Sequence, residues 1–239
     1  MAAEAEFGDP YAVLQPVRSG NAYEETIEHL LRAIKIGVFP VGEKLPPERE
    51  LAEHLGVSRA TLRDALADMQ RVGVIDVQRG RYGGTYVRSA GGTASGQPHA
   101  VPARQRIDAL RFRAVVEPAA AAMAAEAELP VAARDYLRSC LDDACSATED
   151  TYRPLDSRFH IAIAELAGSA SLVAAVADNR ATINALLDEI PVMATNVEHS
   201  HQQHREITMA IERGESDRAR ELMVSHIRGT EFLLRGFLD

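Results

Sequence analysis

The chain has 239 residues, of which 46% are hydrophobic, with 26 Lys and Arg against 35 Asp and Glu, a composition typical of an ordinary soluble globular protein. No apolar run reaches the roughly 18 residues of a membrane-spanning helix, and the first twenty residues lack the apolar core of a signal peptide. Only Cys140 and Cys145 are present, so a disulfide framework is excluded and we expect a cytoplasmic protein without membrane partners.

The acidic charge is unevenly distributed. Residues 44–88 carry eight Lys and Arg against six Asp and Glu, whereas residues 91–239 carry 15 against 22. Affinity for phosphate depends on the local patch rather than on the total, so the first part of this acidic chain remains compatible with DNA binding.

The first part of the chain has the pattern of a small helical domain. Residues 1–20 show little periodicity and are expected to form a flexible arm. Apolar residues with helical spacing follow in three segments, at 23–36, 48–55 and 58–73. The period then changes to that of strands, at 74–78 and 85–88, around the glycine-rich RGRYGG. Three helices followed by a hairpin predict a winged helix-turn-helix domain over residues 21–88.

The second part is expected to be helical throughout. Residues 89–104, SAGGTASGQPHAVPAR, are small and polar and predict a linker. Residues 105–239 predict an all-helical bundle of six helices, or seven if the first one divides near Leu110. The fold class is therefore mainly α, a winged helix-turn-helix followed by an all-α bundle. The expected helices are 105–127, 131–147, 152–167, 171–190, 197–213 and 216–236.

The third predicted helix carries residues suited to base recognition. In a helix-turn-helix, the N-terminal residues of the second of the two helices enter the major groove. Ser58 can cap this helix and face a phosphate, while Arg59 and Arg63 lie one turn apart and suit bidentate contact with guanine. Ala60 permits close approach, and Thr61 can touch a base edge or a phosphate.

Further arginines flank this helix. Arg49, on the preceding helix, can contact the DNA backbone or a neighbouring base, and Arg79 and Arg81, on either side of Gly80, lie at the predicted wing tip and can enter the minor groove. Any one of these arginines is more simply a solvated surface residue. Their order along helix, turn, helix and wing favours binding to double-stranded DNA.

The helical part contains a carboxylate and three histidines on inward-facing positions. Asp156 and His160 are four residues apart on one helix, and His204 and His226 lie on the apolar stripes of two others. Such a set suits Zn²⁺, Ni²⁺ or Mn²⁺. A single inward histidine is more often a core residue with satisfied hydrogen bonds, so the pattern alone leaves the metal site and core packing open. Of the neighbouring histidines His199, His201 and His204, the inward stripe favours the last.

Two groups of motifs resemble one known family. LPPERELAEHLGVSR and LRDAL resemble the DNA-binding domain of the GntR family of bacterial transcription regulators. RFRAVVEPAAAAMAA, LDSRFHIAIAELAG and HREITMAIERGESDRARELMVSHI are similar to the helical, FCD-type effector domain of its FadR-like subgroup. The resemblance covers nearly all of residues 23–235.

The resemblance implies specific roles. It implies that Arg49, Arg59 and Arg63 contact bases, that Arg79–Arg81 form the wing contact, and that a homodimer binds a short palindromic operator. It also implies that Asp156, His160, His204 and His226 hold a divalent metal with sites open for a small carboxylate effector, and that Arg113 pairs with an anionic group there. One departure is Ser169, where the family usually has Asn, which indicates a change in a turn.

We therefore expect a dimeric, ligand-responsive transcription regulator, more often a repressor than an activator. Three alternatives stay open: the metal itself is the signal, the pocket lacks metal and takes a larger acyl-type effector, or the chain is a metal-dependent hydrolase. The motif shows no evident general base, and the attached DNA-binding domain also argues against hydrolysis.

Overall fold

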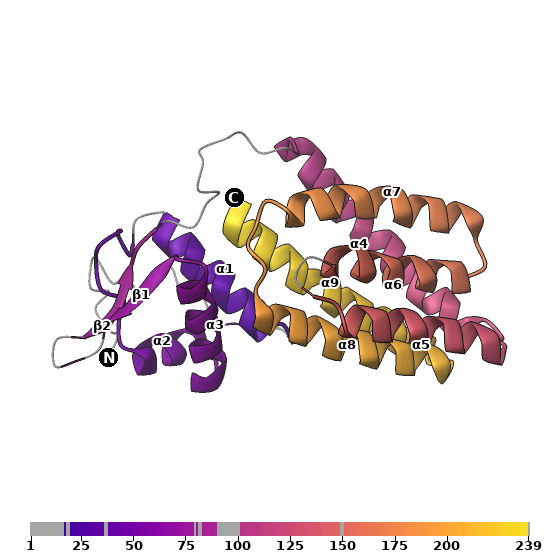
Figure 1. The fold of residues 1–239 in the computed structure, drawn as a ribbon, viewed down its shortest axis with the longest axis horizontal. Helices are drawn as coiled ribbons and strands as arrows, with labels where there is room; N and C mark the ends of the chain where they lie inside the picture. The colour runs from indigo at the N-terminus through magenta and orange to yellow at the C-terminus, as the bar shows by residue number, and fades with distance from the viewer. Residues whose placement is uncertain are drawn as a thin grey trace, which may run out of the picture. The chain divides into compact units, whose positions relative to one another are not determined.

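The computed structural model describes residues 17, 20–35, 38–78, 80, 83–89, 101–148 and 151–238. The described chain is mainly helical and has the expected fold class (Figure 1). It divides into two compact units, residues 1–94 with 232–239, and residues 95–231. None of the described helices is long and apolar enough to cross a membrane. Most of the predicted arm and most of the predicted linker lie outside the described residues, but Val17 of the arm donates its backbone N–H to Leu55 O at 2.8 Å.

The first unit contains three helices around a small apolar core. They are α1 (Ala22–Lys35), α2 (Glu48–Leu55) and α3 (Arg59–Arg71). One face of each helix is apolar and buried, and the core residues include Ile27, Leu30, Leu31, Leu51, Leu55, Leu62, Leu66 and Met69. Gly56 closes α2 with a φ of 66°, a left-handed conformation that favours glycine and lets the chain turn directly into α3.

The hairpin of this unit is paired on both sides of its second strand. β1 (Ile75–Gln78) and β2 (Gly84–Val87) are antiparallel, with Ile75 opposite Val87. On the other side of β2, Leu45 donates its backbone N–H to Thr85 O at 2.7 Å. The second strand of the wing, β2, is therefore held between β1 and the segment that precedes α2.

A buried polar contact joins α1 to α3. Asp68, with 0% of its surface exposed, accepts a hydrogen bond from the Tyr23 hydroxyl through Oδ2 and pairs with Arg71 through Oδ1. Tyr23 is itself 1% exposed. Because a buried carboxylate is costly without such partners, this contact fixes α3 against α1 in one orientation.

The second unit is a helical bundle whose core is rich in alanine. Its helices are α4 (Ala103–Glu126), α5 (Val131–Cys145), α6 (Tyr152–Leu166), α7 (Ala170–Leu187), α8 (Ala194–Glu212) and, up to Glu231, α9 (Ser216–Leu238). α4 packs against α6, α7 and α8, and α5 packs against α6 and α8. Small residues such as Ala121 and Ala124, both fully buried, let the neighbouring helices approach α4 closely, around Phe159 and Ile163 of α6.

The helix number of the second unit falls within the sequence expectation, and the start of its first helix differs from it. α4 is one continuous helix, because Leu110 continues the helical pattern and nothing there interrupts the backbone bonds, so the described part of the bundle has six helices, the smaller of the two predicted numbers. α4 begins at Ala103, inside the predicted linker. Ser169, where an altered turn was expected, caps α7 by accepting a hydrogen bond from the Leu172 N–H, as an asparagine can.

Removing the hydroxyl that satisfies Asp68 is expected to destabilise the first unit. We predict that Tyr23→Phe lowers the free energy of unfolding by about 1–3 kcal/mol, because the buried carboxylate loses a donor while the apolar contacts of the ring remain. Urea unfolding followed by circular dichroism measures the loss.

Tyr136→Phe is the matched control, since the Tyr136 hydroxyl bonds Glu165 at an exposed position. We expect less than about 0.5 kcal/mol there. Equal losses in the two variants would show that the buried Tyr23–Asp68 hydrogen bond contributes no more to the free energy of unfolding than an exposed one.

Candidate DNA-recognition helix and candidate metal centre

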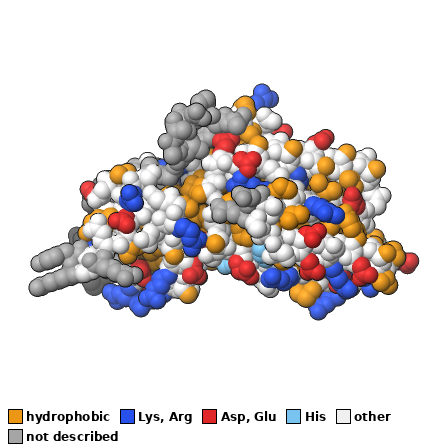
Figure 2. Space-filling model, viewed as in Figure 1, with side chains coloured by type: hydrophobic (Ala, Val, Ile, Leu, Met, Phe, Trp, Pro, Cys, Tyr) orange, Lys and Arg blue, Asp and Glu red, His pale blue; other side chains and the backbone are white. Residues whose placement is uncertain are grey.

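The start of α3 is exposed and well capped. Ser58 Oγ accepts the backbone N–H of Thr61 at 3.0 Å and lies 2.8 Å from its hydroxyl. Arg59, Ala60 and Arg63 are exposed on the first turns that follow. Lys and Arg side chains gather over α2 and α3 in the space-filling view (Figure 2). This end of α3 thus presents its amides, hydroxyls and two guanidiniums outward.

One of the predicted base contacts is held in place by an acidic neighbour. Arg63 Nε donates to Glu48 Oε2 at 2.9 Å, and both side chains are largely exposed. Because only Nε is used, the two terminal nitrogens remain available as a fork for a guanine edge. Arg49, next to Glu48 on α2, is also exposed.

The wing tip is only partly described. Gly80, between the two strands, is exposed and has a φ of 113°. Arg79 and Arg81 lie outside the described residues, so their predicted minor-groove contact stays a prediction.

In the second unit, the four predicted metal ligands come together from three helices. Asp156 and His160 extend from α6, His204 from α8 and His226 from α9, and one ligand atom from each lies within 4.8 Å of all the others. His226 Nε2 is 3.2 Å from His204 Nε2 and 3.3 Å from His160 Nε2. Asp156 Oδ1 is 3.5 Å from His204 Nε2. All four residues are buried.

These separations fit a divalent ion. Nitrogens that each lie about 2.1 Å from a metal are roughly 3.0–3.4 Å apart in octahedral or tetrahedral coordination. The observed separations of 3.2 and 3.3 Å fall in this range. Three imidazoles and one carboxylate are also the donor set that borderline ions such as Zn²⁺, Ni²⁺ and Mn²⁺ accept. Metal binding itself stays a prediction.

Two of the histidines have an oxygen close behind Nδ1. His226 Nδ1 donates a hydrogen bond to the side-chain oxygen of Gln203 at 3.0 Å, which holds the proton there and leaves the lone pair of Nε2 for a metal. His160 Nδ1 lies 2.9 Å from Glu117 Oε2 of α4, although the two atoms are not aligned as a hydrogen bond. Neither Glu117 nor Gln203 was singled out from the sequence.

Two buried arginines complete the cluster. Arg113, predicted at the effector pocket, donates from Nε to Glu117 Oε1 at 2.9 Å, and both side chains are almost fully buried. Arg180 of α7, not foreseen from the sequence, pairs with Asp156 Oδ2 and bonds Ser157. Nη1 of Arg113 and Nη1 of Arg180 are buried and have no hydrogen-bond partner among the described residues. Each arginine therefore keeps a donor for an anion.

The electrostatics keep the carboxyl groups of Glu117 and Asp156 charged and the imidazoles of His204 and His226 neutral. Burial alone would raise the pKa of Glu117, but Arg113, His160 and Arg180 outweigh it and hold that pKa well below its usual value. The pKa of Asp156 is also held well below its usual value: burial would raise it, but Arg180 and the neighbouring histidines outweigh that effect. Burial lowers the pKa of His204 to about 3, and it lowers the pKa of His226 as well. Neutral imidazoles and ionised carboxylates are the protonation states that bind metals.

The other histidines of α8 lie outside this cluster. His201 is buried but packs edge-on against Tyr152, with ring centroids 5.7 Å apart, and His199 is exposed. His204 is therefore the α8 histidine that meets the other three. Cys140 is a buried free thiol and Cys145 a partly buried one, as expected for reduced cysteines.

Comparisons with known proteins identify both parts of the chain. Residues 22–87 match the family model of the bacterial regulatory proteins of the gntR family, and residues 108–229 match that of the FCD domain. The chain is 32% identical over 221 residues to the putative HTH-type transcriptional regulator RmpR of Mycobacterium gastri, covering 87% of this chain and 78% of that protein.

Two other proteins are also similar to the chain. The putative L-lactate dehydrogenase operon regulatory protein of Escherichia coli (strain K12) is 31% identical over 218 residues, covering 82% of this chain and 80% of that protein. A solved structure described as Streptococcus agalactiae GntR is 26% identical, with a TM-score of 0.44, and covers 87% of this chain and 97% of its own.

Because His204 and His226 are buried and neutral, we predict that the metal-free protein loses stability at acidic pH. His204 has a pKa of about 3 when folded and about 6.5 when unfolded, so the unfolded state binds more protons between these values. Stability is then lost as the pH falls below about 6.5, by up to about 1.4 kcal/mol per pH unit for each such histidine. Asp156 and Glu117, with lowered pKa values, lose their contribution only at lower pH.

Urea unfolding in the presence of a chelator, at pH 7.5, 6.5 and 5.5, measures this slope. The His204→Gln/His226→Gln variant should show a shallower one, because it lacks two of the groups that take up protons on unfolding. A wild-type stability that does not change over this range would mean that the native imidazoles are not held neutral.

Proposed function

Because the chain belongs to the GntR family of bacterial transcription regulators and carries an FCD domain, we propose that it is a homodimeric, cytoplasmic repressor released from DNA by a small carboxylate. The family establishes a DNA-binding transcription regulator rather than an enzyme, with an effector domain for a small molecule. The hydrolase alternative is therefore set aside. The dimer, the repressor role, the metal and the carboxylate are the proposal.

In this proposal α3 is the recognition helix. Arg59 and Arg63 enter the major groove, Arg49 reaches the backbone or an adjacent base, and Ser58 and Thr61 face phosphates. Two copies place their recognition helices on half-sites about 34–36 Å apart, so the operator is palindromic. The exposed, capped N-terminal turn of α3 supports this assignment.

The observation that carries the effector part is the convergence of the Nε2 atoms of His160, His204 and His226 beside Asp156. These four side chains hold one divalent ion, with Glu117 and Gln203 orienting two of the histidines. Bound there, the ion supplies a Lewis acid that attracts a carboxylate oxygen. The protein's own part is to orient the ligands and to exclude water from a buried site.

The effector is held by the buried guanidiniums as well. Arg113 and Arg180 each have an Nη1 without a hydrogen-bond partner among the described residues, which suits the second oxygen of a carboxylate. The similar protein of E. coli is named for an L-lactate dehydrogenase operon. Lactate, a small hydroxy acid, is therefore the first compound to try, followed by other small carboxylates.

Regulation requires that effector binding and DNA binding influence each other. A coupling of 1–3 kcal/mol, which is roughly 5- to 150-fold in DNA affinity, is typical of such systems. The alternative that the metal is itself the signal makes a different prediction, a change in DNA affinity on adding metal alone. The alternative of a metal-free site with a larger acyl-type effector is less consistent with four buried, converging ligands.

Removing a predicted base contact should relax sequence recognition. We predict that Arg59→Ala costs about 1–3 kcal/mol of discrimination between the operator and unrelated DNA, because one bidentate guanine contact is lost. Fluorescence anisotropy with an operator duplex from upstream of the chain's own gene, at fixed salt, measures both affinities.

Arg32→Ala is the control, since Arg32 is an exposed arginine of the same unit on α1. It should change neither affinity by more than about twofold, as expected for a surface charge far from the groove. Undiminished discrimination in Arg59→Ala would exclude α3 as the recognition helix in the orientation proposed.

The metal proposal predicts one divalent ion per chain in protein purified without chelators. His226→Ala should weaken metal affinity by at least about tenfold, because one of four ligands is lost. With metal bound, lactate or another small carboxylate should lower operator affinity by roughly 5- to 150-fold. Native mass spectrometry weighs the bound metal and effector, and anisotropy follows the DNA.

His199→Ala, an exposed histidine of the same helix, should bind metal like the wild type. A change in operator affinity on adding metal alone, at constant ionic strength, would instead support the metal as the signal. Unchanged metal content in His226→Ala would contradict the proposed ligand set.

A further inference from the structure

Lys44 connects the segment before α2 to the loop of the wing. It is exposed and lies opposite Tyr86 of β2 in a backbone bridge. Its Nζ donates a hydrogen bond to the backbone oxygen of Gly83, the residue just before β2, at 2.5 Å. A cation from outside the hairpin is therefore attached to the loop that joins β1 to β2.

The side chain of Lys44 reaches Gly83 by lying across Gly84. A Cβ atom placed on Gly84 would be 2.0 Å from Lys44 Cε and 2.6 Å from Lys44 Nζ, far inside van der Waals contact. The missing side chain at the first position of β2 thus leaves the space in which the lysine lies. The attachment depends on a glycine at position 84, because any larger residue there displaces the lysine side chain.

The carbonyl that Lys44 contacts belongs to the turn at the wing tip. Gly83 donates its backbone N–H to Gly80 O at 2.9 Å, so these two glycines begin and end one β-turn, whose outer Cα atoms lie within about 7 Å. Gly80 stands between Arg79 and Arg81, the two predicted minor-groove contacts. The Lys44 ammonium is therefore held beside the part of the wing that is expected to enter the minor groove.

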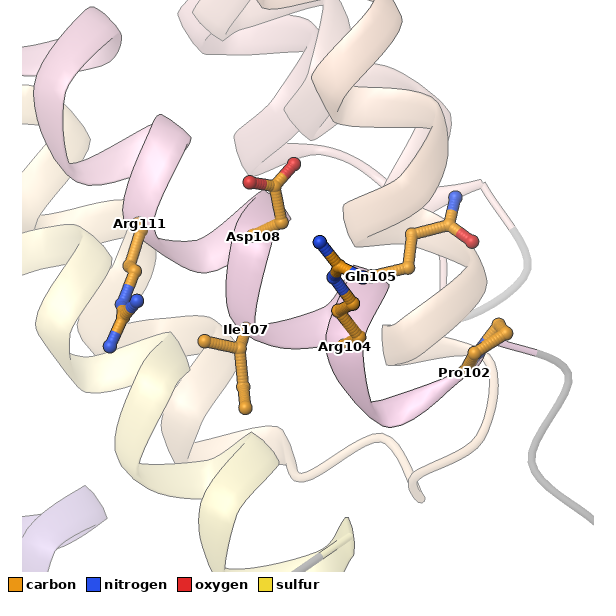
Figure 3. Close-up of a pocket in the computed structure, with 6 residues that line it drawn as sticks. All are labelled: Pro102, Arg104, Gln105, Ile107, Asp108 and Arg111. Carbon is orange, nitrogen blue, oxygen red and sulfur yellow. The ribbon is translucent and has the colours of Figure 1, made fainter.

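A second group of exposed cations is less suited to DNA. Arg104 and Arg111 line an open groove of about 1000 Å³ beside α4, where Arg111 and Ile107 point to the same side (Figure 3). The Asp108 carboxylate lines the same groove, and residues 91–239 are acidic as a whole. These arginines are more simply solvated surface residues, whereas Lys44 is held in one place on the more basic part of the chain.

We propose that Lys44 is a further DNA-contacting residue, which holds the wing loop through Gly83 and donates to a backbone phosphate where the wing enters the minor groove. An ammonium group has three donors and the Gly83 carbonyl takes one, so two remain for a phosphate. The minor groove is about 6 Å wide, so a loop inside it has phosphates close on both sides. This inference rests on the proposed placement of α3 and the wing on DNA.

A phosphate contact from Lys44 has a measurable signature. A lysine that neutralises one phosphate releases counterions, so its removal lowers the slope of log affinity against log salt concentration by about 0.9. At 0.1 M salt this corresponds to about eightfold in affinity. Because a phosphate carries no sequence information, operator and unrelated DNA lose the same factor, in contrast to the loss expected for Arg59→Ala.

The test is a salt titration of DNA binding by the full chain, followed by fluorescence anisotropy with an operator duplex and an unrelated duplex. Lys44→Met keeps most of the apolar stem and removes the charge, so it should lower the slope by about 0.9 on both duplexes. Lys44→Arg should restore the wild-type slope. Arg32→Met, which removes an exposed positive charge from α1, is the matched control and should keep that slope.

Gly84→Ala tests the attachment itself. The added Cβ displaces the lysine side chain and leaves its charge, so affinity should fall by about as much as in Lys44→Met. The double variant Lys44→Met/Gly84→Ala should lose no more than either single variant, because both remove the same contact. Additive losses would overturn the inference.

The remaining outcomes separate the role of Lys44 from that of the recognition helix. An unchanged salt slope in Lys44→Met overturns the inference. A loss of affinity without a change in slope does the same, because it shows a purely structural role for the lysine. Undiminished discrimination in Arg59→Ala contradicts the recognition helix alone, since the slope of Lys44→Met can still be measured on unrelated DNA.

Discussion

The carboxylates of Glu117 and Asp156 and the guanidinium groups of Arg113 and Arg180 are buried together inside the helical unit. Their charges neutralise each other, and the positions of the buried histidines depend on this neutralisation. Isolated, each would cost several kcal/mol to remove from water, and each residue is at most 5% exposed. Glu117 stands between Arg113 and His160, and Asp156 between Arg180 and the histidines. The apolar core around them holds these groups at fixed separations, because close packing leaves little room for rearrangement.

This arrangement links a metal and an anion through shared partners. Asp156 is paired with Arg180 and is also a proposed metal ligand, so an ion that draws on its charge leaves more of the Arg180 charge for an anion. Glu117 has the same double attachment to Arg113 and His160. In the proposed mechanism, metal and carboxylate therefore strengthen each other's binding. The charges of Asp156, Arg180, Glu117 and Arg113 then respond together when either one binds.

The sequence predicted what depends on local periodicity and spacing. The winged helix-turn-helix order and the inward direction of the four proposed metal ligands follow from repeats of two or 3.6 residues. The Ser58 cap follows from the preference of serine for the position before a helix. Residues whose role depends on a distant partner were missed. Arg180 lies on a helix that is apolar on most sides, and only the tertiary structure shows that it faces Asp156. Glu117 stands four residues from Arg113, a spacing that could have indicated the pair. Of the two helix numbers predicted for the bundle, the described residues have six, since no residue near Leu110 ends α4.

α4 carries Arg113 and Glu117 on its inner side and Val115 on its outer side, within a single turn. A rigid helix transmits any axial displacement along its whole length. α4 packs against α6, α7 and α8, so an anion that draws Arg113 away from Glu117 acts on a helix that three others contact. A single buried ion pair is in this way connected to most of the helical unit.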